Sequence, residues 1–98
     1  MTAEALALIA AYFLCSETAE IRVLNQAEAV ACVDTYTDVK LLFIDGVTRD
    51  DYDALTTLEQ VEVNQTAYLA YVAWKDANPD LVAKLERDAQ AQIANTCC

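Results

Sequence analysis

Residues 17–45, ETAEIRVLNQAEAVACVDTYTDVKLLFID, form the longest stretch of this chain in which charge and hydrophobicity follow a regular pattern. At 100° per residue, the apolar side chains fall on one stripe and the acidic ones gather on roughly the opposite side. The stripe contains Ile21, Cys32, Tyr36, Val39 and Phe43, and the acidic face contains Glu20, Asp34, Asp38 and Asp45. This separation predicts one long helix over residues 17–45, which Gly46 would end.

A second pattern overlaps the C-terminal part of this stretch. Between residues 33 and 44, apolar residues and threonines also alternate with a period of two, and Thr35, Tyr36 and Thr37 have β-forming side chains. The segregation of charge favours a helix here, and a strand over residues 33–44 remains the alternative.

The segment before this stretch is predicted to be a separate helix. Thr2 is a suitable N-cap for a helix over residues 3–15, and Ser16 resembles the start of the next one. The first helix is apolar on every side. Such a helix lies either in the middle of a bundle or under a second molecule.

The segment after residue 46 contains three further helix starts. Thr48 and Asp51 form an approximate capping box for a short helix through Leu55. A longer helix is expected to follow and to run to about Ala77, with a capping box either at Thr56 and Glu59 or at Thr57 and Gln60. Asn78-Pro79-Asp80 then places an N-cap, a first-turn proline and a first-turn acid at the start of the last helix.

The composition supports a helical fold throughout. The chain of 98 residues has 56% hydrophobic residues but only one glycine and one proline, which are the residues that the tight turns of sheet proteins need. We therefore predict a single all-α domain over residues 1–98. It should be a small four- or five-helix bundle of the up-and-down type.

Four cysteines and no histidine limit the chemistry. The even number predicts disulfide bonds among Cys15, Cys32, Cys97 and Cys98, for which three pairings exist. A Cys15–Cys32 bond would join two neighbouring helices and stabilise the fold by about 3 kcal/mol. Reduced core cysteines are the alternative. The spacing suits neither a zinc site nor a CxxC redox motif, so we predict no metal and no cofactor.

The net charge of −10 disfavours direct binding to nucleic acids, because phosphate recognition needs clustered basic residues. The absence of histidine removes the usual nucleophile pairs, so an enzyme is not expected. The longest stretch without a charge is shorter than a membrane-spanning helix needs, and membrane insertion is not expected.

The helix predicted before Ala77 carries two apolar stripes. We assign the stripe of Leu58, Val61, Tyr68, Leu69 and Val72 to the core. The second stripe lies nearly opposite and includes Val63, Tyr71 and Trp74, the candidates for a protein-contact surface or a homodimer interface. A helix at the centre of the bundle would also have two apolar faces.

The sequence thus predicts a non-enzymatic protein-binding or structural module that binds a protein partner, including a second copy of itself. Disulfide bonds would place it in the periplasm or outside the cell. The alternative is a cytosolic acidic inhibitor or adaptor that docks on a basic, nucleic-acid-binding protein surface, if Met1 is the native start.

Overall fold

The computed structural model describes residues 1–96, which form α1 (Ala3–Ile21), α2 (Gln26–Leu41), α3 (Arg49–Asp53), α4 (Thr57–Ala77) and α5 (Pro79–Thr96). Within this part of the chain there are five helices and no strand, so the predicted small all-α bundle is confirmed. Residues 33–41 are helical, which answers the question that their alternating pattern left open.

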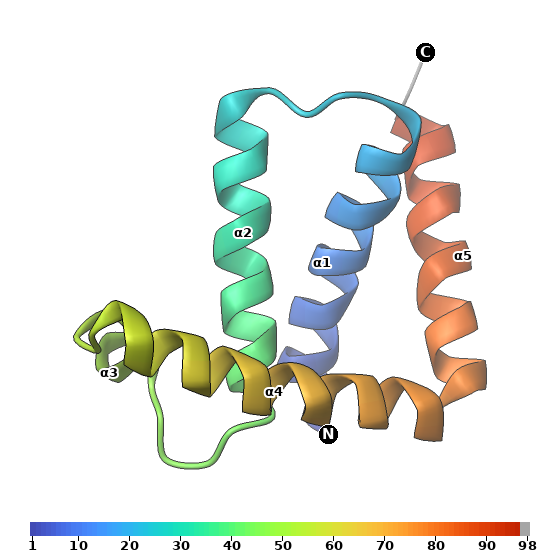
Figure 1. Ribbon diagram of the computed structural model, residues 1–98. Coiled ribbons are helices and arrows are strands. Elements are labelled where there is room, and N and C mark those ends of the chain that lie inside the picture. Colours follow the sequence, from blue (N-terminus) through green and yellow to red (C-terminus); the bar gives the residue numbers. More distant parts are fainter. Residues whose placement is uncertain (97–98) are drawn as a thin grey trace.

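Three of the long helices lie side by side and the fourth crosses them (Figure 1). α1 is in the middle of this layer, packed against α2 on one side and α5 on the other. α4 runs across one face of the layer, near the N-terminal end of α1. None of the helices within residues 1–96 is long and apolar enough to cross a membrane.

The boundary between the first two helices differs from the prediction. α1 continues through Ser16 to Ile21, and α2 begins only at Gln26, so the prediction of one helix over residues 17–45 is wrong. A capping box starts α2. The side-chain oxygen of Asn25 accepts a hydrogen bond from the backbone N–H of Glu28 (2.9 Å), and the Glu28 carboxylate accepts one from the backbone N–H of Asn25 (3.0 Å). This local signal outweighs the long-range periodicity.

The end of α2 also lies earlier than expected. The helix ends at Leu41, where backbone hydrogen bonds from Phe43 to Lys40 and from Ile44 to Leu41 tighten the chain into turns. Gly46, with φ of 78°, lies in the loop beyond these turns and does not end the helix. A left-handed backbone favours glycine here, but the predicted C-terminal cap at Gly46 is wrong.

The remaining helix starts are confirmed. Capping boxes open α3 at Thr48 and Asp51 and α4 at Thr56 and Glu59, and α5 begins at Pro79. Each capping box satisfies backbone N–H groups that have no partner within the helix. The side chain of Asn78, the predicted N-cap of α5, donates instead to the Trp74 carbonyl oxygen at the end of α4 (2.8 Å).

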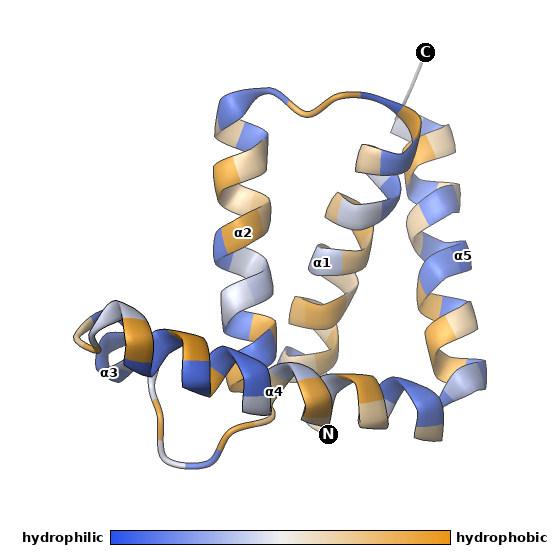
Figure 2. Cartoon of the chain, in the orientation of Figure 1, coloured by the Kyte–Doolittle hydropathy of each residue, from blue (hydrophilic) through white to orange (hydrophobic). Residues whose placement is uncertain are grey.

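The core is small and centres on α1. Ile9 and Phe13 of α1, Val39 of α2, Tyr71 of α4 and Ala89 of α5 form one buried cluster. In Figure 2 apolar colours run through much of α1, as expected for a helix that is covered on several sides.

Candidate functional site

The burial of the two apolar faces of α4 is the reverse of what the sequence predicted. Tyr71 is 3% exposed and lies in the core, and Ala67 beside it is fully buried, whereas Val63 and Trp74 are half-buried. Tyr71 and Trp74 therefore pack in and against the chain's own core, so the prediction that they form an exposed contact surface is wrong, and Val63 is only half-exposed. The reason is steric, because small side chains such as Ala67 let two crossing helices approach closely.

The face predicted to enter the core is on the surface instead. The exposed fractions are 70% for Leu58, 45% for Val61, 50% for Tyr68 and 67% for Leu69. These four residues, with the exposed Gln65 and the half-buried Val72, follow helical spacing along one side of α4, and we call them the α4 stripe. α4 lies in front of the three-helix layer in Figure 2, with apolar and polar colours alternating along it.

Aromatic side chains fill the junction between α1, α2 and α4. The rings of Tyr12 and Tyr36 stack with centroids 4.6 Å apart, and Tyr36 meets Tyr71 edge-on at 6.2 Å. Lys75 Nζ lies 5.2 Å from the centroid of the Tyr71 ring. Burial raises the pKa of Tyr71, with neighbouring phenols and Glu86 contributing.

A cleft of about 190 Å³ opens beside this aromatic cluster, lined by residues that include Tyr12, Tyr36, Tyr68, Lys75 and Glu86. Small-molecule sites usually measure about 300–1,000 Å³. The cleft is thus smaller than a typical ligand pocket, and its rings already contact each other and the lysine. Its geometry favours a packing role for the aromatic cluster.

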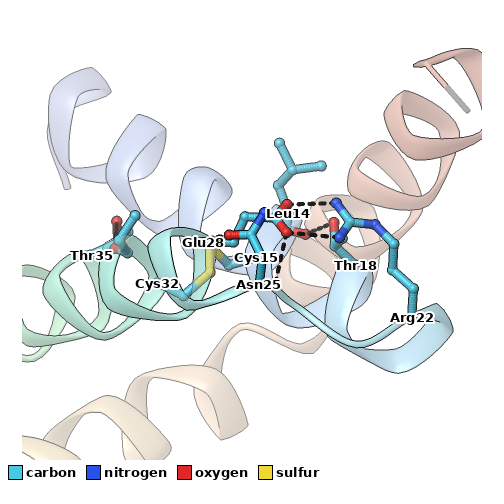
Figure 3. The surroundings of a disulfide bond; sticks show 9 residues. Leu14, Cys15, Thr18, Arg22, Asn25, Glu28, Cys32 and Thr35 are labelled. Atoms are coloured by element: carbon cyan, nitrogen blue, oxygen red, sulfur yellow. Dashed lines mark hydrogen bonds and ion pairs between the residues drawn. A yellow bond between two sulfur atoms is a disulfide. The ribbon is translucent and has the colours of Figure 1, made fainter.

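The predicted pairing of Cys15 with Cys32 is present. Their Cα atoms lie 5.8 Å apart and a disulfide joins α1 to α2 (Figure 3). The longer α1 places Cys15 in the interior of this helix, opposite the second turn of α2. Cys97 and Cys98, the other two candidates, lie outside the described residues.

An ion pair closes the same hairpin at the turn. Arg22 Nη1 and Nη2 donate to Glu28 Oε1 at 2.9 Å and Oε2 at 2.6 Å, and Figure 3 shows this pair near the disulfide. The hydrogen bonds from the Arg22 guanidinium and from the Asn25 amide lower the pKa of the Glu28 carboxyl to about 2. A single helix over residues 17–45 would hold residues 22 and 28 on one helix, six residues apart, so the sequence pattern does not predict this pair.

The lowered pKa of Glu28 predicts an acid-sensitive contribution to stability. Because the folded-state pKa lies below the unfolded-state pKa of 4.5, the contribution is complete above pH 4.5 and is lost as the pH falls towards about 2. Glu28→Gln should therefore flatten the pH dependence of the urea midpoint in this window. Glu20→Gln, which removes one negative charge from α1, is the control for the change in net charge, and equal flattening by both variants would contradict the role of the Arg22–Glu28 pair.

The predicted acidic face is divided between separate elements. Glu20 lies on α1 and Asp45 in the loop after α2, because the single long helix that would align them does not form. Asp34 and Asp38 remain together on α2. Both accept hydrogen bonds from Arg49 of α3, at 3.1 Å from Nη2 to Asp34 Oδ1 and 3.0 Å from Nη1 to Asp38 Oδ1.

Asp53 completes this cluster, since its Oδ1 lies 3.1 Å from Arg49 Nε. One guanidinium thus holds the short helix α3 against α2. We expect Arg49→Gln to lower the amide-exchange protection of residues 51–54, whose backbone amides are the hydrogen-bonded ones of α3. The free energy of unfolding should change by about 1 kcal/mol or less, because the charged groups are partly exposed. Unchanged exchange in α3 would contradict this role for Arg49.

Among residues 1–96, no group of three cysteine, aspartate or glutamate side chains is arranged to hold a metal ion. Comparison of the chain with protein-family models, with curated proteins and with solved structures gives no match.

Proposed function

We propose that this protein is a non-enzymatic protein-binding module and that the α4 stripe is its contact surface. The observation that carries the proposal is the exposure of Leu58, Val61, Tyr68 and Leu69 on one side of a single helix. Exposed apolar groups that lie together on one face are typical of protein-interaction sites, whereas scattered ones need no explanation. A partner that covers the stripe would remove this apolar surface from water.

The chemistry of the stripe fits a protein partner. Tyr68 has a large apolar ring and a hydroxyl on a side chain with few rotatable bonds. For this reason tyrosine is enriched in binding hot spots. The aliphatic residues on either side supply the area that surrounds such an anchor. An apolar helix face of this kind packs into a groove or against another helix.

The rest of the fold acts as the support for this surface. The Cys15–Cys32 bond joins two helices of the layer that α4 crosses, and capping boxes fix the starts of α2, α3 and α4. The presence of a disulfide supports a location of the protein in an oxidising compartment. Alkylation of the native protein with and without reduction, followed by mass measurement, tests this part, and a free Cys15 or Cys32 thiol would contradict it.

A photo-crosslinking experiment tests the contact surface. A benzophenone amino acid replaces Gln65, which is exposed within the α4 stripe, and the protein is irradiated in its native cells. We expect one dominant protein adduct, because a bound partner must lie within reach of this position. Gln92 is an exposed glutamine on α5 and provides the matched control position.

Comparison of the two positions decides the outcome. An adduct at position 65 that Leu69→Arg abolishes, with none at position 92, supports the α4 stripe as the contact surface. The absence of any adduct at position 65, or equal adducts at both positions, would contradict the proposal.

The acidic-inhibitor alternative has no specific observation in its favour. The predicted acidic face is divided between α1, α2 and the loop after α2, and the two residues on α2, Asp34 and Asp38, are paired with Arg49. A protein that imitates a polyanion needs free carboxylates on one surface.

A further inference from the structure

The chain exposes more surface than a compact monomer of its size. Its accessible surface is 6422 Å², whereas a folded monomer of 10.8 kDa is expected to expose about 5,500 Å². The radius of gyration of 14.3 Å likewise exceeds the value of about 12.6 Å expected for this length. This extended shape, 43 × 32 × 19 Å, leaves helix faces such as the α4 stripe without cover from the same chain.

The order of residues along the α4 stripe is self-complementary. If two copies of α4 lie antiparallel with Gln65 facing Gln65, then Leu58 of one copy faces Val72 of the other, and Val61 faces Leu69. In the same register Glu62 faces Tyr68, whose hydroxyl can donate to the carboxylate. Every aliphatic residue of the stripe thus meets another aliphatic residue across a two-fold axis, as an isologous interface requires.

Neighbouring registers lack this complementarity. Moving the axis one turn towards the C-terminus, to Leu69, places Glu62 opposite Asp76, and two like charges repel each other. Moving it one turn towards the N-terminus, to Val61, leaves Leu69 and Val72 opposite positions that precede the start of α4 at Thr57. The axis at Gln65 therefore combines apolar pairing with the absence of facing like charges.

We propose that the partner of the α4 stripe is a second copy of this chain, with the two α4 helices antiparallel and Gln65 at the two-fold axis. This inference rests on the proposed function, because it uses the same surface.

Charge provides a way to distinguish this partner from a basic protein. Two chains of net charge −10 repel each other at long range, and added salt screens this repulsion. Self-association should therefore strengthen as the salt concentration rises. Binding to a basic partner would weaken under the same change, because salt would screen an attraction.

Sedimentation equilibrium of the purified chain, measured over a range of protein and salt concentrations, tests the proposal directly. We expect a monomer–dimer equilibrium, and Leu69→Arg should raise its dissociation constant by about tenfold or more. Val33→Arg is the control, because Val33 is 65% exposed on α2 and outside the stripe. Circular dichroism establishes that both variants retain their helices.

Cross-linking tests the register without depending on an arginine substitution. In a background with Cys97→Ser and Cys98→Ser, Gln65→Cys should form a disulfide-linked dimer under mild oxidation, because the two thiols meet at the axis. Val33→Cys in the same background should remain monomeric. Equal cross-linking of the two variants would overturn the register.

The results also separate this inference from the proposed function. A wild-type chain that stays monomeric at all concentrations, while the benzophenone at position 65 captures a different protein, would overturn the dimer and leave the binding surface intact. A dimer whose dissociation constant does not change with Leu69→Arg would also overturn the proposed interface. A monomer with no adduct at position 65 would contradict both proposals.

Discussion

Tyr71→Ala should lower the free energy of unfolding by about 3–5 kcal/mol, as is typical when a large buried aromatic side chain is truncated. Tyr71 is 3% exposed and contacts the rings of Tyr36, Phe43 and Trp74. Because few residues form the core, this loss is a large part of the roughly 5–15 kcal/mol that stabilises a domain.

Leu69→Ala is the matched control for this prediction. Leu69 precedes Tyr71 by two residues but is 67% exposed, so its truncation should change the stability of the monomer by about 0.5 kcal/mol or less. Urea unfolding at several protein concentrations separates a loss of core packing from the loss of a dimer contact. A larger effect at Leu69 than at Tyr71 at low protein concentration would restore the orientation that the sequence predicts.

Removal of the Cys15–Cys32 bond by the double substitution Cys15→Ser and Cys32→Ser should lower the free energy of unfolding by about 3 kcal/mol. The crosslink spans a sequence separation of 17 residues, and it restricts the unfolded chain much more than the folded one. The m-value in urea should rise as well, since an unfolded chain without the bond exposes more surface.

A second double substitution, Cys97→Ser and Cys98→Ser, controls for the loss of two thiols. It leaves the bond between α1 and α2 in place, so we expect the urea midpoint to stay close to that of the native protein. If instead this control loses as much stability as the Cys15/Cys32 variant, the stabilisation does not come from the bond between α1 and α2.

Local signals in the sequence identify most helix starts correctly. Thr48, Thr56 and Pro79 act through groups within one helical turn, so their effect does not depend on the rest of the fold. Asn25 and Glu28 carry the same kind of signal. The periodicity of residues 17–45 predicts a continuous helix through this capping box and so conceals the start of α2.

The error at the first hairpin shows why periodicity alone is insufficient. The regular pattern in residues 17–45 is compatible with one helix. Most of the apolar stripe lies within α2 alone, however, so its helical spacing is the same whether or not a turn precedes α2. The consequences extend to the acidic face. Because α1 ends at Ile21 and α2 at Leu41, Glu20 and Asp45 are separated from Asp34 and Asp38.

By itself, the sequence determined the all-α class and the starts of the later helices, because these depend on composition and on short-range geometry. It left three pairings open for the four cysteines, and the packing of α1 against α2 is what brings Cys15 and Cys32 together. Only the tertiary structure decided which face of α4 is buried. Both faces are apolar, so hydrophobicity does not distinguish them. The close crossing of α4 over the layer selects the face with Ala67 and Tyr71, and it leaves the α4 stripe exposed.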